Sequence, residues 1–367
     1  MTSVPFLDLK PQYKALQAAI NARIQTVLEH GQFILGPEVI ECEKALAQYI
    51  GSKYCLTAAS GTDALMMALM ALGVGPGDEV ITTPFSFFAT AEVISLVGAT
   101  PIFVDVDPES YNLDPAKLEA AITSKTKVIM PVSLYGQPAD FQEINAIAEK
   151  RGIVVIEDAA QSFGAPYKGK RSCGLSKLGA TSFFPAKPLG CYGDGGAVFT
   201  DDEALHKKME QIRVHGQASR YNHVVVGING RLDTLQCAIL IEKLKRYDWE
   251  IERRNSIAAK FSRELSGLGE RCVVPKIKAD RGSVWAQYTL IVKDRDSFIA
   301  KMKDRGVPTS VHYPTLLHHQ PVYAHLREKF STPIAERLAK SCVSIPIFPD
   351  MTEEQVAHVI QATKESV

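Results

Sequence analysis

The sequence predicts an α/β fold in which a large domain, built on a mostly parallel central sheet, precedes a smaller α+β domain. Residues 56–200 alternate helical patterns with short apolar runs. Those runs are too apolar to face solvent, which is typical of parallel strands covered by helices on both faces. From about residue 235 the alternation gives way to a long helical stretch and then a mixed pattern. We therefore divide the chain into a large domain, residues 1–249, and a small domain, residues 250–367.

The large domain begins its alternation with a helix that is entered at Ser60 and stopped by Gly73 and Gly75. The elements expected after it, in chain order, are a strand over 78–84, a helix over 88–99, a strand over 100–107, a helix over 114–122, a strand over 126–136, a helix over 139–152 and a strand over 152–160. The later part is expected to hold a long helix over 235–265, strands over 285–292 and 308–314 with a helix over 297–306 between them, and an amphipathic helix over 352–366.

Composition excludes several classes of protein. Lys plus Arg and Asp plus Glu each total 41, so the formal net charge of zero argues against a nucleic-acid partner held by phosphate contacts. No apolar run approaches the ~20 residues of a membrane helix, and the start of the chain lacks the pattern of a signal peptide. Seven cysteines without a C-x-x-C pair fit reduced thiols. We expect a cytoplasmic enzyme without a membrane partner or a metal site.

Two polar features are candidates for binding an anion. Ser60-Gly61-Thr62 opens a helix, where free backbone N–H groups and the helix dipole favour a phosphate, although a plain N-cap explains the same residues. Ser182 ends an apolar run and is a second phosphate ligand or simply a strand-end hydroxyl. In a doubly wound sheet both would lie at the edge where ligands bind.

Two charged residues are candidates for catalysis. Asp158 follows the apolar run GIVVIE, so its carboxylate is partly buried and needs a cation or a protonated ring nitrogen, unless it serves as a helix cap or internal ion pair. Lys187 lies between Pro185 and Pro188 in SFFPAKPLGCYGDGGA, ahead of several glycines, and its alternative is a solvated surface lysine. Taken together with the anion site, they match pyridoxal phosphate, which needs a phosphate pocket, an acid opposite its ring nitrogen and an amine for its aldehyde.

The motifs SGTDALMMAL, GDEVITTPFSFFATAEVI, IEDAAQSFGA, SFFPAKPLGCYGDGGA and GINGRLDTLQCAIL resemble the DegT/DnrJ/EryC1/StrS family of sugar-nucleotide aminotransferases. The resemblance covers nearly the whole chain and implies a pyridoxal phosphate-dependent transferase of fold type I. It implies that Lys187 forms the imine with the cofactor and that the amino donor is glutamate. Pro188 stands where the family usually has asparagine, which is consistent with a distinct substrate subgroup.

The resemblance also assigns cofactor ligands. Asp158 is expected at the pyridinium nitrogen and Gln161 near the ring hydroxyl. The phosphate is expected to contact Gly61, Thr62 and Ser182. The stacking ring comes from Phe85, Phe87 or Phe88, and we choose Phe87. Asn229 resembles the asparagine that reaches the phosphate from the neighbouring subunit, which implies a homodimer with shared active sites.

The substrate is the least determined part of the prediction. The PAKPLGCYGDGGA variant resembles family members that aminate the 3-keto group of a UDP-N-acetyl-hexuronic acid for surface polysaccharide synthesis. Arg231 suits the sugar carboxylate, unless it pairs with Asp233 or another acid, and His312 and Tyr313 are further candidates for sugar or phosphate contacts. Another 3- or 4-keto sugar nucleotide is the alternative substrate. His318 and His319 are expected to be solvated loop residues rather than metal ligands.

Three other functions are weaker. A related sugar dehydratase carries histidine at the lysine position, so Lys187 argues against it. A regulatory or scaffold protein would not need both Lys187 and Asp158. A nicotinamide enzyme is disfavoured because the glycines of GVGPGDEV end a helix rather than follow a strand.

Overall fold

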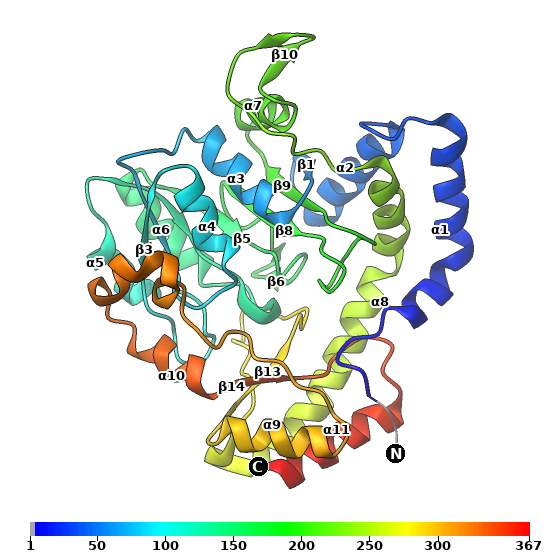
Figure 1. Cartoon of the computed structure of the whole chain (residues 1–367), viewed down its shortest axis with the longest axis vertical. Coiled ribbons are helices and arrows are strands. Elements are labelled where there is room, and N and C mark those ends of the chain that lie inside the picture. The colour runs from blue at the N-terminus through cyan, green and yellow to red at the C-terminus, as the bar shows by residue number, and fades with distance from the viewer. Residues whose placement is uncertain (1–3) are drawn as a thin grey trace.

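The structure, a computed structural model, describes residues 4–367 and is built on a seven-stranded sheet in the order β1-β9-β8-β5-β4-β2-β3 (Figure 1). All pairs are parallel except those that β9 makes with β1 and β8. The predicted α/β fold with a mostly parallel sheet is confirmed. The strands are β1 (Tyr54–Ala58), β2 (Glu79–Thr82), β3 (Thr100–Phe103), β4 (Thr126–Met130), β5 (Val154–Asp158), β8 (Leu178–Ser182) and β9 (Gly196–Thr200).

Helices cover both faces of this sheet because its strands are apolar on both sides. One face packs against α3 (Gly61–Ala71), α4 (Ala89–Leu96) and α7 (Glu203–Arg213). The other face packs against α2 (Pro37–Ile50), α5 (Leu118–Ala121), α6 (Phe141–Arg151) and the first half of α8 (Thr234–Leu265). All four parallel strands from β2 to β5 therefore bury both faces, and their polar residues are confined to the strand ends.

The second half of α8 enters a smaller core around a three-stranded antiparallel sheet of β12 (Cys272–Val273), β13 (Tyr288–Val292) and β14 (Cys342–Ile345). This core also includes α9 (Arg295–Asp304) and α11 (Glu353–Ser366). The predicted long helix and the terminal helix are confirmed. Because α8 crosses residues 249 and 250 without a break and Val4 packs in the smaller core, the chosen domain boundary stays a prediction.

Several predicted strands are shorter than expected, and one is not a strand. The one expected over 126–136 ends at Met130, because Pro131 has no N–H for the ladder, and residues Leu134–Gly136 form the short helix η2. The one expected over 308–314 is wrong: only Ser310 forms an isolated bridge, to Ser344. In the same segment Tyr313 contacts Gln161 of the large domain at 3.0 Å, whereas His312 contacts Ser344 of the smaller sheet at 2.9 Å.

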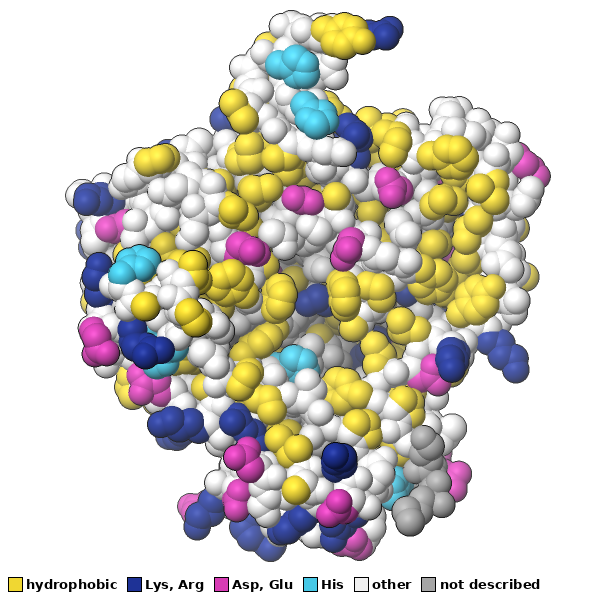
Figure 2. All heavy atoms as spheres, viewed as in Figure 1, with side chains coloured by type: hydrophobic (Ala, Val, Ile, Leu, Met, Phe, Trp, Pro, Cys, Tyr) yellow, Lys and Arg dark blue, Asp and Glu magenta, His cyan; other side chains and the backbone are white. Residues whose placement is uncertain are grey.

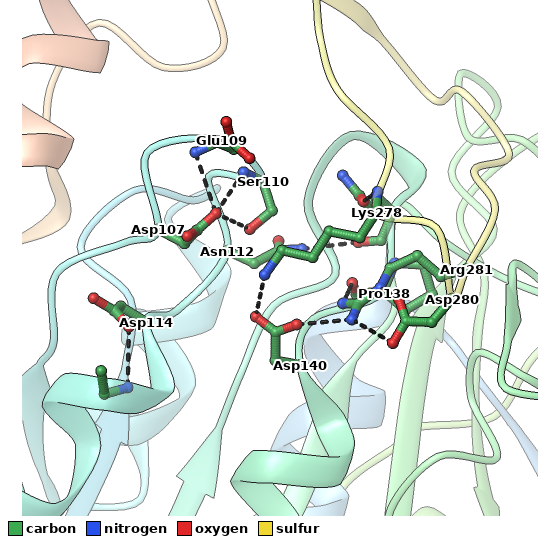
Figure 3. A network of polar contacts seen from close by, with 12 residues as sticks. Asp107, Glu109, Ser110, Asn112, Asp114, Pro138, Asp140, Lys278, Asp280 and Arg281 are labelled. Atoms are coloured by element: carbon green, nitrogen blue, oxygen red, sulfur yellow. Dashed lines mark hydrogen bonds and ion pairs between the residues drawn. The ribbon is translucent and has the colours of Figure 1, made fainter.

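The two sheets are joined by a polar network shown in Figure 3. Asp140, at the start of α6, binds the Lys278 ammonium and the Arg281 guanidinium, each at 2.7 Å. Arg281 also donates to the Pro138 carbonyl at 2.9 Å and pairs with Asp280 at 2.7 Å. Because Arg281 is buried in this network, the segment after α8 is held against the large sheet.

Several further elements complete the fold. The hairpin of β10 (Gln217–Ser219) and β11 (Asn222–His223) projects from the body of the molecule, and α1 (Lys10–His30) runs along one side (Figure 1). No helix within residues 4–367 is long and apolar enough to cross a membrane. The other short elements are η1 (Pro115–Lys117), β6 (Pro166–Tyr167), β7 (Lys170–Arg171), η3 (Ser266–Arg271), η4 (Leu317–His319), η5 (Pro321–Lys329) and α10 (Pro333–Ser341).

Candidate active site

The carboxylate of Asp158 lies at the carboxyl end of β5 and is 4% exposed. Its Oδ2 accepts a hydrogen bond from Thr90 Oγ1 at 2.8 Å, and its Oδ1 accepts one from the Ala160 N–H at 3.2 Å. Burial raises the pKa of Asp158, while these two bonds and the charge of Lys187 oppose the rise. Within residues 4–367 no cation forms an ion pair with this carboxylate, so it can hold a cationic group of a ligand.

Lys187 reaches the same place from the loop after β8. Its N–H donates to the Phe184 carbonyl at 2.8 Å, and Phe183 closes the loop through backbone bonds of 2.7 Å with Cys191 and Gly195. Burial lowers the pKa of the Lys187 amine, and the charge of Asp158 opposes that shift. Lys187 is half-buried rather than fully solvated, and its neutral form is more accessible than that of a free lysine.

The start of α3 forms an anion cradle beside Ser182. The Ser60 hydroxyl caps the helix by accepting the Asp63 N–H at 3.0 Å, whereas the N–H groups of Gly61 and Thr62 have no acceptor within residues 4–367. A Cβ on Gly61 would lie 2.6 Å from Ser182 Cβ, so only glycine permits this approach. Similarly, a Cβ on Gly196 would lie 2.4 Å from the Ser60 carbonyl oxygen, which explains the need for glycines after the lysine loop.

Gln161, Tyr313 and His312 extend the site toward the smaller sheet. Gln161 donates to the Tyr313 hydroxyl at 3.0 Å and accepts the Tyr135 N–H at 2.8 Å. Burial and then the nearby charge of Asp158 raise the pKa of Tyr313. Burial and the charge of Lys187 lower the pKa of His312 to about 4, so its ring is neutral at pH 7. The segment 308–314, wrongly predicted as a strand, thus contributes two neutral polar side chains to the site, those of His312 and Tyr313.

Of the three aromatic candidates, only Phe87 keeps its ring available. Phe85 is 1% exposed and packs edge-on to Tyr313, and Phe88 packs against Tyr323. Phe87 is 57% exposed, with its ring centroid 6.4 Å from that of Tyr313. The choice of Phe87 as the stacking ring fits this arrangement and stays a prediction.

Asn229 and Arg231 lie on the segment that precedes α8. Their segment is anchored beside α3 by the bond from the Ala59 N–H to the Gly230 carbonyl at 2.9 Å. The Asn229 side chain is exposed, and the buried Nε of Arg231 has no partner within residues 4–367. The alternative in which Arg231 pairs with Asp233 is not seen. The roles of both residues stay predictions.

The expectation that His318 is a solvated loop residue is wrong. Its ring is fully buried against Phe103 and Phe330, and burial lowers its pKa to about 4, so it is not a solvated loop histidine. Across residues 4–367 no group of three or more His, Cys, Asp or Glu side chains could hold a metal ion.

These residues fit pyridoxal phosphate, because a cradle that a Cβ would fill, a buried carboxylate with spare capacity and a desolvated lysine match its three requirements. Figure 2 shows that this face of the molecule is hollowed at its centre. Sequence reasoning missed Thr90 and Tyr135, which orient Asp158 and Gln161. Nothing in the sequence around Thr90 indicates that its hydroxyl contacts Asp158. Tyr135 contacts Gln161 through its backbone N–H, which every residue except proline carries, so its side chain gives no indication either.

The fold and the site define a pyridoxal phosphate-dependent enzyme of the aminotransferase class. The model of the DegT/DnrJ/EryC1/StrS aminotransferase family matches residues 14–364, and the chain belongs to this family. It is 56% identical over 346 residues to the UDP-2-acetamido-2-deoxy-3-oxo-D-glucuronate aminotransferase of Pseudomonas aeruginosa, covering 94% of this chain and 95% of that protein. The predicted family, fold type, enzyme class and cofactor are confirmed.

Two further relatives were compared. The pleiotropic regulatory protein of Geobacillus stearothermophilus is 47% identical over 99% of this chain and 98% of its own length. The crystal structure of NtdA from Bacillus subtilis with the bound cofactor PMP has a TM-score of 0.93 and 34% identity, and the match covers 100% of this chain and 85% of that one.

Proposed function

We propose that the protein transfers an amino group from glutamate to the 3-keto carbon of UDP-2-acetamido-2-deoxy-3-oxo-D-glucuronate. The observation that carries the proposal is that buried Asp158 and half-buried Lys187 lie near enough to influence each other's charge, in the same large domain as the Gly61 cradle. The high identity to the Pseudomonas aeruginosa enzyme, along nearly the full length of both chains, supports this sugar nucleotide.

The roles of the chain's own residues follow from the site. Pyridoxal phosphate, when bound, supplies the electron sink for the carbanion that forms at the donor α-carbon. Gly61, Thr62 and Ser182 hold its phosphate, and Asp158 holds its ring nitrogen in the protonated form. Lys187, freed as a neutral amine, takes the proton from the donor α-carbon and later returns a proton to carbon 3 of the sugar.

The carboxylate of the sugar distinguishes this substrate from neutral ones. Arg231 has a buried Nε without a partner in residues 4–367, so its guanidinium can donate hydrogen bonds to a carboxylate without breaking an existing ion pair. His312 and Tyr313 are neutral at pH 7 and suit sugar hydroxyls or the amide.

Two measurements test the chemistry. The purified protein is expected to be yellow, and borohydride reduction is expected to fix the cofactor to Lys187, as located by peptide mass spectrometry. The variant Lys187→Ala should have no turnover with any keto-sugar nucleotide. Retained transamination in Lys187→Ala would refute the assignment.

A panel of keto-sugar nucleotides, assayed with glutamate, tests the substrate. Arg231→Ala is expected to lower kcat/KM for the uronic acid substrate by about 10- to 100-fold, the loss expected for a charge-assisted hydrogen bond, and to affect its neutral counterpart far less. Arg263→Ala, an exposed arginine on the far part of α8, is the matched control. Equal losses on both sugars in Arg231→Ala would remove the carboxylate argument.

A homodimer with shared sites is part of the proposal. Phe33, Ile34 and Leu35 are exposed in the turn between α1 and α2, and exposed apolar patches of this kind mark interfaces. Ile34 forms a bridge with Asp233, which puts this patch next to the segment that carries Asn229. A second copy that covers the patch would bring Asn229 toward its partner's cradle.

Hybrid dimers test the sharing of sites. Lys187→Ala and Asn229→Ala should each be impaired alone, whereas a mixture that exchanges subunits forms one complete site in each hybrid. Random exchange makes half of the dimers hybrid, so about a quarter of the wild-type activity should return if the dimer is a closed two-fold pair. No recovery after verified exchange would place Asn229 in its own subunit's site or outside the chemistry.

A further inference from the structure

A buried group of charged side chains lies on α8, next to the loop that carries Lys187. Lys243 and Glu250 are 2% and 1% exposed, and Arg254 is also buried. Lys187, Lys243 and Arg254 border one small cavity, with Gln12 of α1 on the same wall. Charged side chains are rarely buried to this extent without partners, so the contacts of each group show what it lacks.

Two carboxylates of this group are already in use. Glu250 accepts a hydrogen bond from Gln12 Nε2 at 2.7 Å and lies 3.7 Å from Arg254 and 3.8 Å from Arg246. Asp350, also on the cavity wall, pairs with Arg246 at 2.5 Å. Glu250 and Asp350 therefore engage the two arginines, and neither lies at ion-pair distance from Lys243.

Lys243 is the cation left over. Within residues 4–367 its ammonium has no hydrogen-bond acceptor and no carboxylate at ion-pair distance, and its one close contact is the face of the Tyr192 ring at 4.9 Å. Asp8 also borders the cavity, but its Oδ1 accepts the Lys10 N–H at 2.9 Å. Burial lowers the pKa of Lys243 to about 8, so most of it stays charged at pH 7.

A second cation of the same group is incompletely satisfied. Arg254 Nη1 is buried and makes no hydrogen bond within residues 4–367, although it lies 3.7 Å from Glu250 Oε2. Buried donors without acceptors are rare in native proteins and call for an explanation, such as a ligand. The unpaired Lys243 ammonium and this open donor of Arg254 at one cavity indicate an anion rather than a cation or an apolar molecule.

We propose that Lys243 and Arg254 bind a carboxylate of the amino donor. The free space at the cavity is about that of one water molecule, which admits one carboxylate oxygen, while the rest of the donor lies toward Lys187. The inference rests on the proposed function, in which the donor's amine must arrive at Lys187. It assigns the donor's anion to α8 and leaves Arg231 for the sugar.

The test uses Lys243→Met, with Lys245→Met as the control. Lys245 lies on the same helix, is well exposed and pairs with Glu242. The holoenzyme is titrated with glutamate, and separately with alanine, while the absorbance of the bound cofactor reports its conversion to the amine form. Lys243→Met should weaken the dependence on glutamate by about tenfold or more, whereas Lys245→Met should stay within about twofold. A loss that extends to alanine identifies the α-carboxylate, and a loss confined to glutamate identifies the distal one.

Stability gives a second measurement that does not depend on turnover. Removing a buried, unpaired cation should leave the melting temperature of Lys243→Met unchanged or higher, whereas removing a merely structural lysine should lower it. Titration calorimetry with glutarate, a dicarboxylate without an amine, should show weaker binding in the same variant. If Lys243→Met does not fold, Arg254→Gln takes its place in both titrations.

The outcomes separate this inference from the function on which it rests. If the wild-type holoenzyme responds to glutamate and Lys243→Met responds identically, with unchanged glutarate binding, the anion subsite is refuted and the aminotransferase stands. If the wild type responds to no amino acid, the proposed function itself fails.

Discussion

Replacing Thr90 by valine tests how the structure holds the acid of the active site. Thr90 Oγ1 donates to Asp158 Oδ2 at 2.8 Å, and the hydroxyl also contacts Ser86 Oγ at 3.0 Å. Valine has nearly the same shape as threonine, so the change removes the hydrogen-bond donor without leaving a cavity. Asp158 then keeps the Ala160 N–H as its hydrogen-bond donor within the described chain, at 3.2 Å.

The size of the effect follows from the charge on the acceptor. A hydrogen bond to a charged group is worth about 1.5–3 kcal/mol, which corresponds to a loss of about 10- to 100-fold. Burial already raises the pKa of Asp158, and the Thr90 bond opposes that rise, so the variant should raise this pKa further. With a higher pKa, the carboxyl group of Asp158 becomes protonated at a higher pH than in the wild type. A protonated carboxyl group no longer forms an ion pair with a protonated ring nitrogen.

The assay measures kcat/KM against pH and the retention of pyridoxal phosphate on dialysis. Thr90→Val should lose about 10- to 100-fold in kcat/KM near neutral pH, and the acid limb of its profile should move to higher pH. Thr90→Ser keeps the hydroxyl and should stay close to wild type. A Thr90→Val enzyme with the wild-type acid limb and normal cofactor retention would show that Asp158 does not depend on this bond.

Three further predictions follow from the packing. Gly61→Ala places a methyl group 2.6 Å from the nearest side-chain carbon and should weaken the binding of pyridoxal phosphate. The control Gly75→Ala, whose new methyl group has its nearest atom 3.8 Å away, should not weaken it. Equal dissociation constants of the cofactor for the two variants would contradict the proposed phosphate cradle. Asp140→Ala removes a carboxylate from buried Arg281 and should lower the free energy of unfolding in urea by about 2 kcal/mol; an unchanged value would show that the network is not stabilising. The pKa of His318 is about 4, below that of a free histidine, so protonation favours the unfolded state and stability should fall as pH drops from 6.5 to 4; His318→Gln should flatten that slope, and an identical slope would refute the assignment.

The fold was predictable where the residues of a strand themselves show that the strand is buried. Runs such as VIM (128–130) and IVVI (153–156) are apolar at every position, so they predict covered parallel strands, and the alternation with helices supplies their order. The antiparallel direction of β9 was not predicted, because an apolar run looks the same in either direction. It does follow from a physical constraint: the β8–β9 connection contains no helix, and an antiparallel neighbour does not need one.

The segment 308–314 failed for a different reason. Its alternating residues match a half-buried strand, but pairing depends on a free neighbouring edge, and it makes only the single bridge from Ser310. Its side chains form other contacts instead: His312 Nδ1 lies 2.9 Å from Ser344 Oγ, and the Tyr313 hydroxyl accepts a hydrogen bond from Gln161 at 3.0 Å. The apolar periodicity is therefore satisfied without a strand, because Val311 and Tyr313 pack against the cluster around Phe85.

The same distinction separates the predicted site residues from those the sequence could not reveal. Lys187 and Asp158 were predictable because their unusual neighbours, the prolines and the apolar strand, are adjacent in sequence. Thr90 and Lys243 were not, since a hydroxyl in the first turn of α4 and a lysine in IEKLKRY have nothing local to mark them. Lys243 differs from the neighbouring exposed lysine only because α8 turns it toward the cavity beside Lys187. Candidate residues with unusual sequence neighbours can thus be found from motifs, whereas a buried hydroxyl or lysine on a helix can be found only when the tertiary fold shows which face of the helix is buried.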